Sequence, residues 1–135
     1  MARKTPLRLP ALKPYAEKVS TAEQAVEHIR NGDHVFVGTG CAAPGSLLRA
    51  MEAMPVPPVD VELLHFFTFR AFGHDEAGNS TTPFRHRVFF VSADMRSALK
   101  QGLVDYVPIS VARVPEMIAL GRIPVDVALI QVSLP

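Results

Sequence analysis

The stretch VFVGTGCAAPGS, residues Val35 to Ser46, decides the fold, because it joins an apolar strand to a helix through a glycine-rich loop. The β-favouring residues Val35 to Val37 predict the strand. The residues GSLLRAMEAM (45–54) carry apolar side chains at helical spacing. Pro44 suits the first helical turn, where its missing N–H costs nothing. Strand, loop and helix in this order predict one unit of an α/β domain.

The segments around this unit repeat the alternation. STAEQAVEHIRNG (20–32) predicts a helix that opens with a capping box of Ser20 and Glu23 and closes at Gly32. VELLHFF (61–67) predicts a buried strand. The polar stretch RAFGHDEAGNSTTPFRH (70–86) predicts an excursion from the sheet. Further elements are predicted as a strand at Val88 to Val91, a helix from about Ala93 to Gln101, a strand near Tyr106 to Ile109, a helix from about Pro115 to Leu120 and the strand VDVALIQV (125–132).

This order predicts an α/β fold with an open, mostly parallel sheet and helices on both faces. The last strand is the most apolar, and Val125, Val127, Leu129 and Val132 predict a central strand that is covered on both faces. The sequence ends directly after it. We therefore expect further structure to follow this strand.

Length and composition predict a single globular domain. The chain has 135 residues, is 48% hydrophobic and carries a formal net charge of +1. Residues 1–19 are interpreted as an N-terminal extension and residues 20–135 as the domain. Lys+Arg 14 against Asp+Glu 13 offers no electrostatic footprint for nucleic acid. The first 14 residues contain three prolines and spaced charges, which predicts no membrane span and a cytoplasmic protein.

Metal binding is not expected either. The single Cys41 excludes an internal disulfide and a cysteine-cluster metal site. No two of the five histidines stand at a convincing ligand spacing.

Two phosphate-binding motifs can be laid over the loop, and neither fits well. A phosphate loop needs a lysine after its last glycine, and Ser46 stands there. The dinucleotide fingerprint matches Gly38, Gly40 and Ala43. However, the ribose-binding acid expected at the end of the next strand is missing from HFFTF (65–69). The sequence therefore disfavours a nucleotide.

Two further interpretations of the loop stay open. Cys41 could be a nucleophile, since a helix N-terminus favours the thiolate, with His65 or His86 as the base. Nothing in the spacing pairs either histidine with the thiol, and a lone cysteine is more often a small residue in a turn. Alternatively, the turn presents backbone N–H groups to an oxyanion or a carbonyl oxygen. That device needs another segment to supply the nucleophile.

Three stretches in combination resemble the N-terminal domain of the acetyl-CoA hydrolase and transferase family, which includes 4-hydroxybutyrate and butyryl/acetate CoA-transferases. They are GDHVFVGTGCAAPGSLLRAM (32–51), TPFRHRVFFVSADMRSALKQGLVDYVPI (82–109) and RIPVDVALIQVSLP (122–135). The resemblance covers nearly all of residues 20–135. It implies the open, NagB/RpiA-like α/β fold of CoA-transferases and an active site between two such halves.

The resemblance also implies a reaction. In this family a glutamate carboxylate attacks the acyl-CoA thioester, an enzyme-CoA thioester forms, and a carboxylic acid acceptor leaves as the new acyl-CoA. That glutamate belongs to a C-terminal half, so no catalytic residue is expected in this chain, and the chain alone is expected to be inactive. The implied partners are acyl-CoA, a small carboxylate, the C-terminal half and further copies in a homo-oligomer. Coenzyme A is expected as substrate, with no permanently bound cofactor.

The resemblance assigns binding roles to the loop and to the end of the last strand. Phe84, Arg85 and His86 match an FRH element before a strand, interpreted as a structural anchor in preference to a substrate contact. Asp126 is assigned to the last strand. The substrate- or CoA-binding residues that the resemblance implies are Gly38, Thr39, Gly40, Cys41, Ala42, Ala43, Pro44, Gln131 and Ser133.

The alternative to the enzyme half is a stand-alone α/β module that binds a nucleotide or acyl-CoA.

Overall fold

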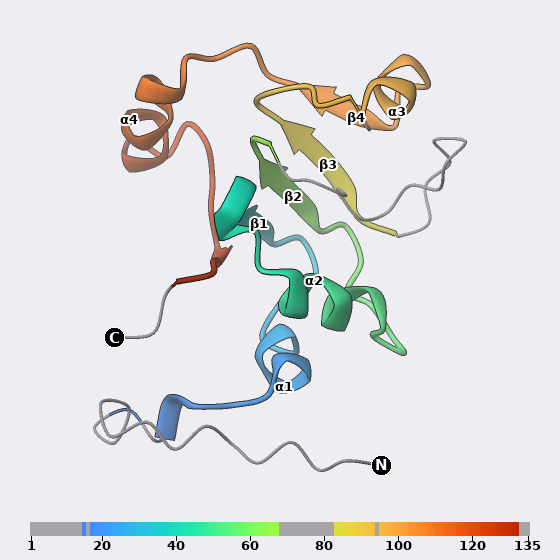
Figure 1. Ribbon diagram of the computed structural model, residues 1–135, viewed down its shortest axis with the longest axis vertical. Helices are drawn as coiled ribbons and strands as arrows, with labels where there is room; N and C mark the ends of the chain where they lie inside the picture. The colour runs from blue at the N-terminus through green and yellow to red at the C-terminus, as the bar shows by residue number, and fades with distance from the viewer. Residues whose placement is uncertain (1–14, 16, 68–82, 94, 133–135) are drawn as a thin grey trace.

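The computed structural model describes residue 15 and residues 17–67, 83–93 and 95–132. In this part of the chain, five strands form one sheet in the order β4-β3-β2-β1-β5, and every pairing is parallel (Figure 1). This confirms the predicted open α/β fold. The strands are β1 (His34–Val37), β2 (Glu62–His65), β3 (Arg85–Val88), β4 (Val104–Tyr106) and β5 (Val127–Leu129).

Helices cover both faces of the sheet. Successive side chains of a strand point to opposite faces, so Val35 packs with α1 and α2 while Phe36 packs on the side of α4. Figure 1 shows α4 well apart from α1 and α2. A third cluster packs α3 against β3 and β4 through Met95 and Val104. The helices are α1 (Ala22–Val26), α2 (Gly45–Glu52), α3 (Arg96–Lys100) and α4 (Val114–Ala119).

The first helix begins one residue later than predicted and is much shorter. Its capping box consists of Thr21 and Gln24: the Gln24 N–H donates to the Thr21 hydroxyl, and the Thr21 N–H donates to the Gln24 side chain. The predicted box of Ser20 and Glu23 is therefore wrong. The helix ends at Val26 instead of reaching Gly32, because the following turns tighten to bonds between residues three apart.

The third strand was placed three residues too late. It begins at Arg85, so Arg85 and His86 of the FRH element lie inside the strand and not before it. The alternation of charged and buried residues hid the strand, because Arg87 is held on the sheet by an ion pair with Glu62. Strand β4 begins at Val104, two residues earlier than the predicted Tyr106. Helix α3 covers Arg96–Lys100 and is shorter than predicted. Residues 70–82 of the predicted excursion lie outside the described residues.

The last strand is not central in the described part of the chain. Strand β5 has three residues, Val127 to Leu129, and pairs with β1 alone. Ile130 and Val132 beyond it are 56% and 75% exposed. Apolar composition predicted burial on both sides, but composition does not reveal whether a neighbouring strand is present on the outer edge.

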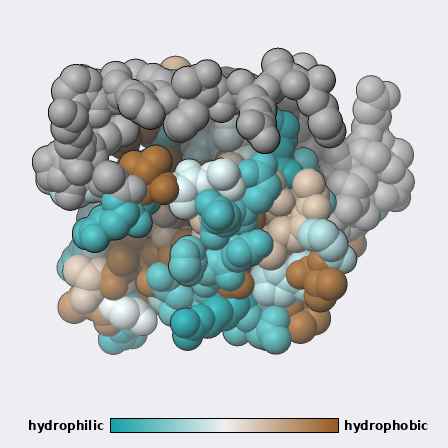
Figure 2. Space-filling view, turned by 90° about the horizontal axis from the view of Figure 1, so that it is seen from below, coloured by the Kyte–Doolittle hydropathy of each residue, from teal (hydrophilic) through white to brown (hydrophobic). Residues whose placement is uncertain are grey.

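The surface around α1 is mixed. Figure 2 shows the molecule from below, with hydrophilic surface interrupted by separate hydrophobic patches. Val56 and Val59, in the turn between α2 and β2, are among the exposed apolar residues. No helix in the described ranges is long and apolar enough to cross a membrane.

Candidate functional site at the carboxyl edge of the sheet

The loop after β1 lies between the ends of two neighbouring strands. On the β5 side, the Gly38 N–H donates to the Leu129 carbonyl at 2.8 Å, and the Gln131 N–H donates to the Ala42 carbonyl at 3.2 Å. On the β2 side, the Gly40 N–H donates to the Phe67 carbonyl at 2.7 Å. The loop therefore lies at the carboxyl edge of the sheet, where open α/β sheets bind their ligands.

The two glycines of the loop are needed for different reasons. A Cβ at Gly38 would lie 2.3 Å from the Ala42 carbonyl oxygen, closer than any real contact. Gly40 has open space around it, but its φ of +55° is a conformation that side chains disfavour. Residues Gly40 to Ala42 form a 3-10 turn that leads towards α2. This local geometry explains why the sequence GTG follows the strand.

Most N–H groups of the loop are used within the protein. Besides Gly38 and Gly40, the amides of Ala42 and Ala43 donate to carbonyls of the same turn. Within the described residues, Thr39 and Cys41 are the two positions from 38 to 43 whose amides have no recorded acceptor. The predicted binding of an oxyanion by loop amides stays a prediction, and the geometry narrows it to these two groups.

The thiol and the two histidines do not come together as a nucleophile and its base. His65 Nε2 lies 3.3 Å from His86 Nδ1, and both rings are buried. Cys41 is exposed in the loop. This favours the anchor interpretation of the FRH element, since Phe84 is also buried and Arg85 forms an exposed ion pair with Asp60.

The other described segments that follow the strands are apolar or neutral. Phe67 follows β2 and Phe90 follows β3, and their ring centroids are 5.5 Å apart. Gln131 follows β5, is exposed and contacts the loop through its N–H. Ser133 lies outside the described residues. None of the described segments that follow the strands contains Asp, Glu, Lys, Arg or His: they are residues 38–44, 66–67, 89–92, 107–110 and 130–132.

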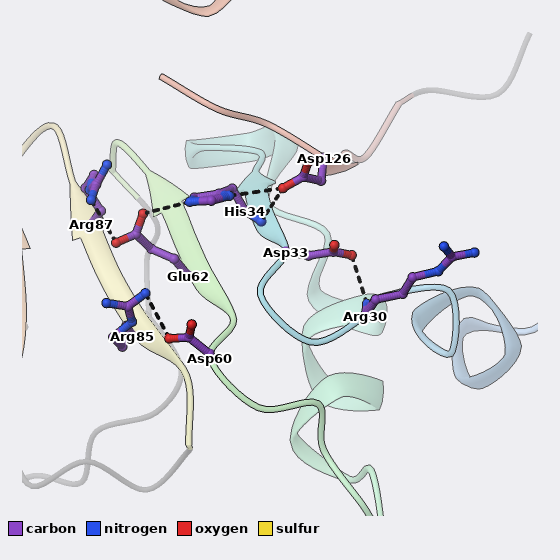
Figure 3. Close-up of polar contacts among 8 residues, drawn as sticks. All are labelled: Arg30, Asp33, His34, Asp60, Glu62, Arg85, Arg87 and Asp126. Carbon is purple, nitrogen blue, oxygen red and sulfur yellow. Dashed lines mark hydrogen bonds and ion pairs between the residues drawn. The ribbon is translucent and has the colours of Figure 1, made fainter. Parts of the chain in front are cut away.

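The amino edge of the sheet has the opposite character (Figure 3). The His34 ring nitrogen Nδ1 lies 3.0 Å from Asp126, and its Nε2 lies 3.9 Å from Glu62. Arg87 binds the other oxygen of Glu62 at 3.0 Å. Asp126 was assigned to the last strand, but it lies one residue before β5, at this edge. The His34 N–H bond to Asp126 is the main cause that lowers the pKa of that carboxyl group.

Sequence reasoning missed this amino-edge network. Its signal was a charged residue at or just before the start of four of the five described strands, in GDHV (32–35), VDVE (59–62), FRHR (84–87) and PVDV (124–127). The described residues contain no group of three or more His, Cys, Asp or Glu that could hold a metal ion.

The fold and the loop define the class of protein: an α/β domain with an all-parallel sheet in the described residues, a class that generally binds its ligands at the carboxyl ends of the strands. The family model of the acetyl-CoA hydrolase/transferase N-terminal domain matches residues 5–135. The chain therefore belongs to the acetyl-CoA hydrolase/transferase family.

Relatives and solved structures agree with this assignment. The chain is 35% identical over 121 residues to a 4-hydroxybutyrate coenzyme A transferase of Clostridium kluyveri, covering 90% of this chain and 28% of that protein. It is 26% identical to a succinyl-CoA:acetate/propanoyl-CoA:succinate CoA transferase of Fasciola hepatica, covering 86% of this chain and 24% of that protein.

The structure of RipA from Yersinia pestis matches 81% of this chain and 27% of that protein, with a TM-score of 0.66 and 25% identity. A 4-hydroxybutyrate CoA-transferase structure from Porphyromonas gingivalis shares the fold, with a TM-score of 0.60 and 23% identity over 91% of this chain and 27% of that protein. The chain thus spans 28% or less of the length of the curated relatives it matches.

Proposed function

We propose that this chain is the N-terminal half of a CoA-transferase or acyl-CoA hydrolase. The enzyme exchanges CoA between an acyl-CoA and a small carboxylic acid through a glutamyl-CoA thioester. The glutamate belongs to a C-terminal half that lies outside this chain. The single observation that carries the proposal is the loop Gly38–Pro44, which is fixed at the carboxyl edge of a sheet whose fold matches that of a 4-hydroxybutyrate CoA-transferase.

The placement of the acidic residues supports a nucleophile from elsewhere. Glu62 is 2% exposed, lies at the amino edge and is paired with Arg87. The described segments at the carboxyl edge contain no carboxylate. A group that attacks a thioester held at the loop must therefore come from a residue outside these segments.

In this proposal the loop contributes binding and charge stabilisation. The thioester carbonyl faces the loop, and the amide of Cys41 donates to its oxygen as negative charge develops. Because such amide donors are fixed in place before the reaction, no free energy is spent on reorienting them when that charge forms. The aromatic pair of Phe67 and Phe90 supplies apolar surface beside the acyl group. Apolar surface that excludes water from the acyl group favours transfer to a carboxylate over hydrolysis.

The proposal is tested by following label from a short carboxylate such as acetate into acyl-CoA. We expect no transfer above background from the 135-residue chain alone, because the carboxylate that forms the covalent intermediate is missing. The native protein, purified from its source, should be longer than this chain and should catalyse the exchange. Robust turnover by the chain alone would contradict the division into two halves. The homo-oligomer and the cytoplasmic location stay predictions.

A further inference from the structure

The side chain of Thr39 bonds the loop to the end of β2. Its hydroxyl accepts a hydrogen bond from the Phe67 N–H at 2.8 Å and donates one to the Phe67 carbonyl at 2.5 Å. The Gly40 N–H donates to the same carbonyl. One side chain therefore contacts both backbone groups of a residue that is 28 positions away. We call these two hydroxyl bonds the Thr39 clamp.

The clamp changes what Thr39 can do. A hydroxyl has one hydrogen to donate, and here it is given to the Phe67 carbonyl. Thr39 cannot donate that hydrogen to a substrate oxygen while the clamp is closed. We propose that Thr39 is a positioning residue for CoA transfer: it holds the loop against β2 so that the amide of Cys41 meets the thioester. This inference rests on the proposed function.

The two sides of the loop depend on the sequence to different degrees. On the β5 side, the bonds of Gly38 and Gln131 are made by backbone atoms alone. On the β2 side, the Thr39 hydroxyl makes two of the three recorded bonds. Loss of this hydroxyl leaves the bond from the Gly40 N–H to the Phe67 carbonyl and therefore loosens the loop on the β2 side only. The expected movement is a tilt away from β2 with the fold intact.

The clamp also reaches beyond the loop. The Phe67 ring contacts the Phe90 ring, so fixing the Phe67 backbone sets where this aromatic pair stands. The clamp thus links the loop after β1 to residues that follow β2 and β3. A group displaced by about 1 Å from its productive position costs on the order of a hundredfold in rate. Small movements at this point are thus expected to affect turnover.

The test compares Thr39→Val with Thr39→Ser in the complete enzyme, meaning this chain together with its C-terminal half. Valine keeps the shape and removes both clamp bonds, whereas serine keeps the hydroxyl. We expect Thr39→Val to lower kcat roughly 10- to 100-fold with little change in the KM for acyl-CoA. Thr39→Ser should recover most of the lost kcat. Wild-type turnover tests the proposed function separately.

Thr21→Val is the matched control. The Thr21 hydroxyl also accepts a backbone N–H, but it caps α1 instead of holding the loop. This variant should lower the melting temperature and leave kcat unchanged. The inference is overturned if Thr39→Val behaves like this control. It is also overturned if Thr39→Val raises KM alone, as for a direct substrate contact, or if serine does not restore kcat.

Discussion

The carboxyl and amino edges of the sheet differ in how they are stabilised. At the carboxyl edge, the loop after β1 is held by backbone bonds and the Thr39 clamp, and the described segments contain no charged side chain. At the amino edge, ionisable side chains connect neighbouring strands, because His34 and Arg87 both lie beside Glu62. Where the described segments carry no charge, a ligand or another part of the protein can supply it. At the amino edge, the Glu62 carboxylate already has a cation of this chain, Arg87.

The largest loss of stability is expected from a substitution that breaks the ion pair at the amino edge. Arg87→Leu leaves the buried Glu62 carboxylate without its nearest cation, and removal of one partner of such a pair costs about 3 kcal/mol of the free energy of unfolding. Arg85→Leu is the control, because its pair with Asp60 is largely exposed and is worth less than about 1 kcal/mol. Urea unfolding of both variants measures the difference. Equal costs would show that the buried pair has no special role.

The next largest loss of stability is expected from substitutions in the loop at the carboxyl edge. Gly38→Ala forces a Cβ against the Ala42 carbonyl, and the resulting overpacking costs about 1–3 kcal/mol. Gly40→Ala has open space and strains only φ, at about 1 kcal/mol. Thermal unfolding orders the two variants. The account of the loop is wrong if Gly40→Ala destabilises the protein more than Gly38→Ala does.

A smaller effect is expected from pH. Because the bond from the His34 N–H lowers the pKa of Asp126, the stabilising contribution of this carboxylate is present above the ordinary aspartate pKa. It is lost as the pH falls through the lowered value. The difference in melting temperature between wild type and Asp126→Asn should therefore shrink on acidification below that ordinary value. A difference in melting temperature that grows in acid would contradict the lowered pKa of Asp126.

The smallest effect is expected at the thiol. Cys41→Ala keeps the amide and removes an exposed sulfur, so stability should change by less than about 0.5 kcal/mol. Turnover of the complete enzyme should be largely retained. Gly40→Val is the contrast, because it alters the loop backbone and should lower kcat far more than the melting temperature. Loss of activity in a folded Cys41→Ala protein would show that the thiol takes part in the reaction.

Local patterns were enough to predict the α/β fold and the loop. The strand Val35–Val37, the glycines and the helix after Pro44 are signals within a dozen residues, and the structure places them as expected. Boundaries were less predictable, because a strand such as β3 alternates charged and buried residues. Its arginines pair with acidic residues on the neighbouring strand and in the turn before it, and the local sequence of β3 does not reveal these partners.

Contacts between distant residues could not be predicted from the sequence. His34 and Asp126 are 92 positions apart, and Thr39 and Phe67 are 28 apart. No period or motif connects such pairs, since they meet only after the strand order is fixed. The position of β5 at an edge of the described sheet could not be predicted either, because apolar composition does not encode strand order.

The contrast between the two edges is tested most directly by titrating the ¹⁵N-labelled chain with acetyl-CoA and following its backbone amides by NMR. We predict chemical-shift changes at the carboxyl edge, centred on Thr39 and Cys41, with the amides of His34 and Glu62 unchanged. Changes centred on the amino edge, or a loop that stays silent at millimolar ligand, would contradict the assignment of the carboxyl edge as the substrate-facing side.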